Sequence, residues 1–200
     1  MDMLHYYSRE PASRERRFVI RDRVRGFRIE LVSASGVFSA RRIDRGTRLL
    51  VESMIVEDEW TILDLGCGYG IVGIVAAKLA PRGVVYMVDI NRRAVELAKL
   101  NARINGVRNV EVLWGDLYEP VAGIVFDAVV SNPPQAAGRG VLRRIVRGAR
   151  ACLRPGGLLQ LVARHAKGGA RLMEEMEETF GNVEVVAKRG GFRVYVSRSS

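Results

Sequence analysis

From residue 60 onward, short apolar runs alternate with longer stretches in which apolar residues recur at helical spacing. The short runs predict β-strands at 61–65, 84–89, 110–114, 126–131 and 157–162. The stretches between them predict helices at 71–80, 92–104 and 141–153, with proline or glycine marking their ends. Such alternation is typical of βαβ units, so we predict a doubly wound, Rossmann-like α/β fold with a mostly parallel sheet.

Both ends of the chain add further elements. Near the C-terminus, β-like runs at 183–187 and 192–196 flank two glycines and predict a hairpin. Near the start, strands are expected at 18–24 and 27–32 and a helix at 46–55. Residues 1–50 are too few to bury a core of their own. We therefore predict one domain over 1–200, with 1–50 as an extension packed on a Rossmann-like core at 51–200.

The composition limits the class of protein. The chain has 200 residues, and its two cysteines, Cys67 and Cys152, are too few for a disulfide framework or a four-ligand zinc site. Its apolar runs stop short of the roughly 18 residues of a membrane span. Residues 1–10 are polar and charged, unlike a secretory signal. We therefore expect a soluble, cytoplasmic protein with no metal and no membrane contact.

The chain is strongly basic, with 32 Lys and Arg against 22 Asp and Glu and a net charge of +10. Such an excess favours binding to polyanions such as nucleic acid. Residues 139–171 carry nine basic side chains and no acidic one. Two interpretations stay open: a solvated helix surface in an arginine-rich protein, or a surface that contacts RNA phosphates. The second predicts RNA contacts at Arg139, Arg143 and Arg144.

A glycine-rich turn follows the first strand of the core. Asp64 and Leu65 lead into Gly66, Gly68 and Gly70, and a helix begins directly afterwards. Glycines let the backbone approach a ligand closely, and the helix start offers free amides. A dinucleotide site needs its third glycine three positions after the second, and the even spacing here does not match that pattern. The turn therefore favours a ligand that has no pyrophosphate.

Acidic residues follow the next two predicted strands. Asp89, with Ile90 beside it, comes at the end of 84–89, where a carboxylate can accept hydrogen bonds from ribose hydroxyls. Asp116 and Leu117 follow 110–114, where an acid can accept from an adenine amino group. Because the carboxyl ends of parallel strands share one edge of the sheet, these groups together predict a nucleoside-type cofactor site.

A stiff loop, Asn132-Pro133-Pro134-Gln135, follows the fourth core strand. Its prolines have no backbone donor, and Pro133 disfavours the helical region for Asn132. The loop can hold the Asn132 amide oxygen and the Pro133 carbonyl as two acceptors for the two donors of an amino group. We therefore predict Asn132, Pro133 and Pro134 as the catalytic residues, with Gln135 contacting the substrate.

These motifs together resemble those of the class I S-adenosylmethionine-dependent methyltransferases, and the Asn-Pro-Pro loop resembles the branch that methylates planar amino nitrogens. Ser35 to Ser39 and Asp44 to Thr47 resemble the small-subunit ribosomal RNA guanine-N2 methyltransferase family and its short archaeal relatives. The resemblance implies a seven-stranded sheet with an antiparallel last strand and S-adenosylmethionine as cofactor. It implies cofactor contacts at Asp64, Gly66, Gly68, Gly70, Asp89, Ile90, Asp116, Leu117, Asn132, Phe38 and Thr47, with Arg45 closing the far side and contacting RNA.

The sequence departs from that family in two places. Gln135 occupies a position at which amino-methylating relatives carry an aromatic, and the chain has only the catalytic half of the bacterial guanine-N2 enzymes. We predict methylation of guanine N2 in ribosomal RNA by a monomer or weak dimer. The alternatives are a transfer RNA guanine-N2 methyltransferase, a protein glutamine methyltransferase, a non-catalytic RNA-binding module that keeps a cofactor pocket, and a dinucleotide-dependent oxidoreductase.

Overall fold

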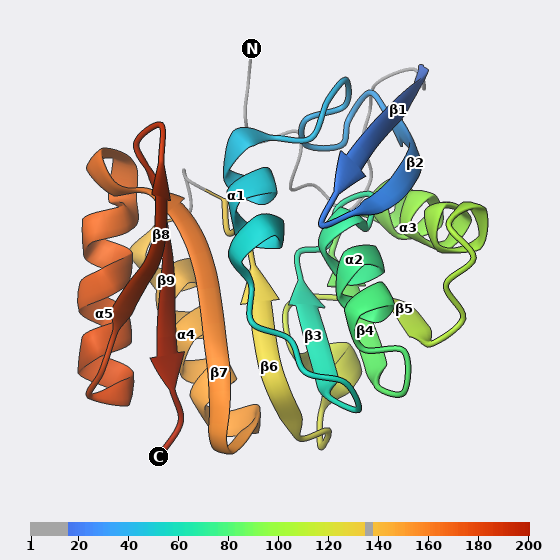
Figure 1. Ribbon diagram of the computed structural model, residues 1–200. Coiled ribbons are helices and arrows are strands. Elements are labelled where there is room, and N and C mark those ends of the chain that lie inside the picture. Colours follow the sequence, from blue (N-terminus) through green and yellow to red (C-terminus); the bar gives the residue numbers. More distant parts are fainter. Residues whose placement is uncertain (1–15, 135–137) are drawn as a thin grey trace.

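The computed structural model describes residues 16–134 and 138–200, and its centre is a seven-stranded sheet. The strands are β3 (Thr61–Leu65), β4 (Val84–Asp89), β5 (Val110–Trp114), β6 (Phe126–Ser131), β7 (Leu153–Arg164), β8 (Glu184–Arg189) and β9 (Phe192–Arg198). They lie in the order β5-β4-β3-β6-β7-β9-β8 (Figure 1). Of the pairings, only those that β9 makes with β7 and β8 are antiparallel among the described residues, which confirms the predicted sheet and its antiparallel last strand.

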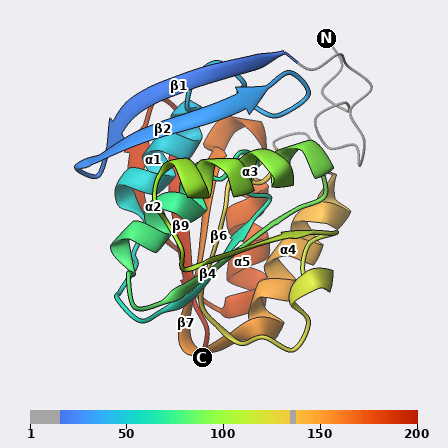
Figure 2. The ribbon, with the colours of Figure 1, turned by 90° about the vertical axis from the view of Figure 1, so that its right-hand side faces the viewer.

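Helices cover both faces of this sheet (Figure 2). One face carries α1 (Arg45–Ser53), α2 (Ile71–Leu79) and α3 (Arg92–Ile104), and the other carries α4 (Arg139–Cys152) and α5 (Ala170–Phe180). Each strand alternates between the two cores: Ile62 packs with the first set of helices and Leu63 with the second. A short 3-10 turn, η2 (Glu119–Val121), follows β5.

Most predicted elements are confirmed, and the differences have local causes. The helix predicted at 141–153 begins two residues earlier, after Gly138, and ends one residue earlier, where Leu153 has extended backbone and begins β7. The strand predicted at 157–162 extends over all of β7. No element is predicted from the sequence for the stretch that forms α5, although Leu172, Met176 and Phe180, four residues apart, form its buried side.

The N-terminal strands β1 (Arg17–Val24) and β2 (Phe27–Ala34) form a separate antiparallel pair that lies over α3 (Figures 1 and 2). Two asparagines fix it, Asn101 in α3 and Asn105 directly after that helix. The Asn101 side chain accepts from Val32 N at 2.7 Å and donates to Val32 O at 2.8 Å, and Asn105 bonds both backbone groups of Glu30. This pair therefore packs mainly on α3, with a smaller contact between β1 and α1, and α1 is the part of the extension that packs on β7 and β9. The single-domain division stays a prediction.

The parallel strands all end at one edge of the sheet. The order of strands reverses between β3 and β6, so loops diverge there and leave room for a ligand. Within the described residues no helix is long and apolar enough to cross a membrane, and no group of three or more acidic, cysteine or histidine side chains is placed to hold a metal ion.

Candidate functional site

A cavity of about 710 Å³ opens at this edge, between the ends of β3, β4 and β6. Its volume lies in the usual range of small-molecule sites. The structure brings most of the predicted site residues together in its lining, namely Phe38, Thr47, Asp64, Gly66, Gly68, Asp89, Ile90, Asp116, Leu117, Asn132, Pro133, Pro134 and Arg144. Residues from widely separated segments of the chain therefore converge on one site.

The glycine turn shapes one wall of the cavity. Gly66, Gly68 and Gly70 have φ angles of 74°, 55° and 93°, a left-handed region in which any other residue is strained. The amides of Gly66 and Cys67 both donate to the Val88 carbonyl, at 2.8 and 3.0 Å, and so fix the turn to β4. Gly70 is not part of the lining; it precedes α2 with a left-handed backbone, and a Cβ there would lie 3.1 Å from that of Ala98, which explains why that position is glycine.

Asp64 lies at the base of the cavity and is only 2% exposed. Its Oδ2 accepts a hydrogen bond from Gly73 N at 2.8 Å. Burial raises the pKa of Asp64 to about 7, the hydrogen bond from Gly73 partly offsets that rise, and the charge of Asp89 adds to it. A cationic ligand group beside this carboxylate would restore its ionised form.

Asp89 joins the cavity to the glycine turn. Its Oδ2 accepts from Gly68 N and its Oδ1 from Asn91 N, both at 2.8 Å. Burial raises the pKa of this carboxyl, and backbone amides that favour the ionised form oppose the rise. The carboxylate therefore holds the turn in shape from the same position that lines the cavity.

The third acidic position is linked to α4. Asp116 accepts a 2.8 Å hydrogen bond from Arg144, and both residues line the cavity. Leu117 has a φ of 51°, uncommon for a residue other than glycine, within a turn closed by Glu119 N donating to Asp116 O at 3.1 Å. This arrangement holds the Leu117 backbone at the lining of the cavity.

The acceptor loop is held in a single orientation. Asn132 Nδ2 donates to Thr47 Oγ1 at 2.8 Å and, more weakly, to Asp44 Oδ2 at 3.4 Å. Because the Asp44 carboxylate only accepts, the NH₂ side of the amide must face it. Asp44 is itself fixed by accepting from Gly46 N and Thr47 N at the start of α1. Among residues 16–134 and 138–200, no group donates to Asn132 Oδ1, so this oxygen stays available.

The structure adds residues that the sequence does not single out. Asp44 has no cofactor or substrate role in the prediction, and its contact with Asn132 spans 88 positions, for which the sequence carries no signal. Tyr69, Val141 and Ile145 contribute further apolar lining. Burial raises the pKa of the Cys67 thiol well above its usual value, so this side chain is a neutral thiol at the cavity.

The residues predicted to contact RNA do not all lie at the cavity. Arg144 is at the cavity, but Arg143 lies outside its lining and is paired with Glu175 of α5 at 3.2 Å. Arg139 is exposed at the start of α4, and Arg45 is exposed at the start of α1. Gln135 lies outside the described residues. The basic stretch that lacks acids in sequence therefore receives them in space from α5 and from Asp116.

The sequence that builds this cavity matches a known family. The family model described as the methyltransferase small domain matches residues 28–196. The chain belongs to the methyltransferase small domain family. The predicted resemblance to class I methyltransferases is thereby confirmed.

Bacterial proteins are among its relatives. An uncharacterised protein of Bacillus subtilis, YbxB, is 36% identical over 192 residues, which cover 95% of this chain and 96% of that protein. The ribosomal RNA small subunit methyltransferase C of Serratia proteamaculans is 32% identical over 84% of this chain but only 48% of its own length. The archaeal type that the sequence suggests stays a prediction.

A solved structure supports the same relationship. A 16S rRNA N2 methyltransferase of Thermus thermophilus, determined in complex with AdoMet and guanosine, superimposes with a TM-score of 0.82 and 26% identity, over 95% of this chain and 52% of that one. The chain thus spans about half the length of the relatives that carry a ribosomal RNA methyltransferase name.

Proposed function

We propose that this methyltransferase transfers a methyl group from S-adenosylmethionine to the N2 amino group of a guanine in ribosomal RNA. The observation that carries the proposal is the orientation of Asn132, whose NH₂ group is held by Thr47 and Asp44 while its Oδ1 stays free of any described donor at the cavity. An oxygen fixed in this way can accept from an amino group that is to be methylated.

The cavity fits the cofactor. A buried carboxylate with a raised pKa, Asp64, suits the ammonium of the methionine end. Asp89 would accept from the ribose hydroxyls, with Ile90 beside it, and Asp116 with the Leu117 backbone would contact the adenine. The AdoMet bound in the Thermus structure and the family name support the same ligand. When bound, S-adenosylmethionine supplies a methyl group already activated on a sulfonium.

The chain's own residues position and stabilise the amine. An aromatic amino group is a poor nucleophile because its lone pair is delocalised into the ring. Hydrogen bonds from its protons to Asn132 Oδ1 and the Pro133 carbonyl would favour a pyramidal nitrogen and stabilise the positive charge that develops there. As the new nitrogen–carbon bond forms, the carbon–sulfur bond breaks, and the nitrogen then loses one proton to water.

No strong base is needed in this scheme. His165 is engaged by Tyr195, with Nδ1 2.9 Å from the hydroxyl, and does not line the cavity. Pro133 and Pro134 lack backbone donors and so keep the loop stiff, which limits the protein's task to holding the two reactants in line.

RNA is favoured as the substrate over protein. The names of the relatives, the guanosine in the Thermus structure and the net charge of +10 support it. A ribosomal RNA substrate implies a cytoplasmic enzyme, and we propose that it acts as a monomer or weak dimer.

The decisive experiment is transfer of labelled methyl to cell extract that has been treated with either nuclease or protease. We expect label that is lost on nuclease treatment and appears as N2-methylguanosine in small-subunit ribosomal RNA when nucleosides are resolved by mass spectrometry. Label found in transfer RNA, or in glutamine side chains of protein, would show that this molecule is the substrate and not ribosomal RNA. Binding of S-adenosylhomocysteine without any transfer would mark a non-catalytic module, and binding of NAD instead would mark an oxidoreductase.

A further inference from the structure

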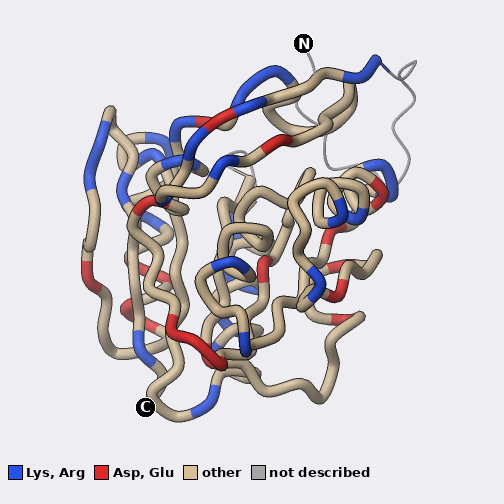
Figure 3. The backbone as a smooth tube through the Cα atoms, turned by 45° about the vertical axis from the view of Figure 1, so that its right-hand side comes forward, with Lys and Arg blue, Asp and Glu red and all other residues tan. Residues whose placement is uncertain are grey.

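Unneutralised basic side chains gather at the carboxyl edge of the sheet, next to the acceptor loop. Figure 3 shows many basic segments along the upper end of the molecule, the end at which β3 and β6 finish in Figure 1. Six basic residues in the loop before α1, at the start of α1, at or just after the end of β7 and near the start of β9 have no carboxylate within 4.0 Å among the described parts of the chain. We call them the basic rim: Arg41, Arg42, Arg45, Arg164, Lys167 and Arg193.

Contacts join the two parts of the rim that lie at α1 and at the end of β7. A Cβ on Gly46, at the start of α1, would lie 2.8 Å from the ring of Phe192 at the start of β9. The Arg164 guanidinium lies 5.2 Å from the centroid of that same ring. His165 N donates to Gly191 O at 3.0 Å, which fixes the end of β7 to the β8–β9 turn. The start of α1 and the end of β7 are therefore neighbours.

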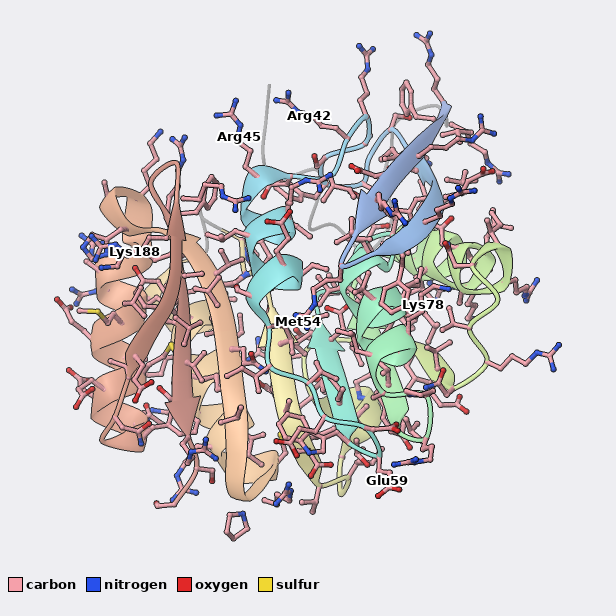
Figure 4. The ribbon with its side chains drawn as sticks, in the orientation of Figure 1. Arg42, Arg45, Met54, Glu59, Lys78 and Lys188 are labelled. Atoms are coloured by element: carbon pink, nitrogen blue, oxygen red, sulfur yellow. The ribbon has the colours of Figure 1, made fainter. Side chains whose placement is uncertain are left out.

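The rim is also continuous with the acceptor loop. Arg45 lies between Asp44 and Thr47, the two residues that hold the Asn132 amide. Arg42 is linked from the other side, since its carbonyl accepts from the hydroxyl of Tyr69, which lines the cavity, at 3.4 Å. In Figure 4 the side chains of Arg42 and Arg45 project away from the body of the molecule at this edge.

The position of Arg45 is unfavourable for the helix itself. It is the first residue of α1, whose first turn contains no acid, and a positive charge there opposes the helix dipole. Arg48, one turn later, is neutralised by Asp22 and Glu52. A charge that destabilises its own helix and has no neutralising partner in the described chain suits an external polyanion.

Three of the five arginines of α4 are arranged in the opposite way. Arg143 and Arg147 share Glu175, at 3.2 and 3.6 Å, and Arg144 is paired with Asp116. A phosphate would have to compete with these carboxylates. At the rim, no such competition exists among the described residues.

We propose that the phosphates of the RNA bind the basic rim, so that the strand on either side of the target base crosses the start of α1 rather than α4. This inference rests on the proposed function and names the surface that its substrate uses. Single-stranded RNA is the form expected, because the amino group must leave its base pair to reach the Asn132 oxygen.

The test compares two triple variants of equal net charge. One is Arg41→Gln, Arg42→Gln and Arg45→Gln at the rim, and the matched control is Arg139→Gln, Arg143→Gln and Arg147→Gln on α4. None of these side chains lines the cavity, so S-adenosylhomocysteine should bind equally to both and to the unmodified protein. A third protein with lysine at the three rim positions restores the charge.

Binding of a small-subunit ribosomal RNA transcript is measured over a series of salt concentrations. Loss of three contacts should reduce the slope of log K against log salt by about 2, which corresponds to roughly 100-fold weaker binding at 0.1 M salt. The α4 triple should keep a near-normal slope, and the lysine triple should recover most of the loss.

The outcomes separate the two proposals. An α4 triple that loses as much affinity as the rim triple, or a rim triple that binds RNA normally, overturns the rim. Rim-dependent RNA binding without methyl transfer by the unmodified protein supports the rim and overturns the proposed activity. Methyl transfer by the unmodified protein that neither triple variant impairs supports the proposed activity and overturns the rim.

Discussion

Replacement of Asp64 by asparagine offers a direct test of the charge at the base of the cavity. Asparagine keeps an oxygen that can accept from Gly73 N, at present a 2.8 Å contact, and replaces the ionisable group with an NH₂ group of similar size that does not titrate. The buried carboxyl has a pKa of about 7 in the folded protein, whereas its ordinary value in an unfolded chain is about 4. The folded state therefore holds a proton that the unfolded chain releases between these two pH values.

The sign and size of the effect follow from this difference. Below about pH 4 both states are protonated, and Asp64 does not affect stability through titration. Stability then falls as pH rises toward 7 and stays reduced above it. A difference of about 3 pH units corresponds to roughly 4 kcal/mol. In a chain of this size that equals a Tm change on the order of 10 °C.

The measurement is thermal or urea unfolding of both proteins without cofactor, from about pH 3.5 to about pH 8, a range that spans the two pKa values. We expect Asp64→Asn to be more stable than the unmodified protein at the upper limit and nearly equal to it at the lower one. Because all other titrating groups are common to both proteins, the difference isolates Asp64. A gain of the same size at both limits, or no gain at the upper one, would refute the reasoning.

The same proton should govern ligand binding. S-adenosylhomocysteine carries an amino acid ammonium, which favours the ionised carboxylate, so its affinity should rise by up to about tenfold per pH unit as pH approaches 7 from below. The Asp64→Asn variant should bind more weakly and without this pH dependence, as measured by calorimetric titration.

Three further predictions concern the acceptor loop and the glycine turn. Asn132→Ala should lower kcat by about 10²-fold or more while the Kd for S-adenosylhomocysteine stays within about twofold, because only the developing charge loses its acceptor; normal turnover would remove Asn132 from the mechanism. Thr47→Val should lower kcat about tenfold by freeing the Asn132 amide to rotate, whereas Thr47→Ser, which keeps the hydroxyl, should remain active; equal activity of the two variants would contradict this. Gly68→Ala should cost about 1–2 kcal/mol in urea unfolding because φ is 55° there, and an unchanged midpoint would contradict the strain.

Local signals account for what the sequence predicts well. The glycine spacing predicts a turn whose backbone a ligand can approach closely, and the positive φ angles at Gly66, Gly68 and Gly70 are the physical reason for glycine there. Parallel strands share an edge, so Asp89, Asp116 and Asn132 could be placed together from strand ends alone. Helix α5 shows the limit, since its apolar side is present in the sequence but follows an irregular segment at His165–Gly169.

The features that the sequence does not predict depend on contacts between distant segments of the chain. The charge count along 139–171 treats its nine basic residues as one acid-free block. The packing of α5 against α4 brings Glu175 to Arg143 and Arg147, about 30 positions away, and no periodicity encodes that pairing. Asp44 reaches Asn132 only because α1 begins beside the end of β6.

The same packing changes where the positive charge is free to act. Arg143, Arg144 and Arg147 of this acid-free run are neutralised on α4, while the loop before α1, which contains Asp44, carries arginines that no described carboxylate offsets. Free charge rather than total charge sets the affinity for phosphate, because a paired arginine must first break its own ion pair. The unpaired part of the net charge of +10 therefore lies on the side of the cavity at which Asn132 is held. The proposed RNA strand and the acceptor oxygen share that side.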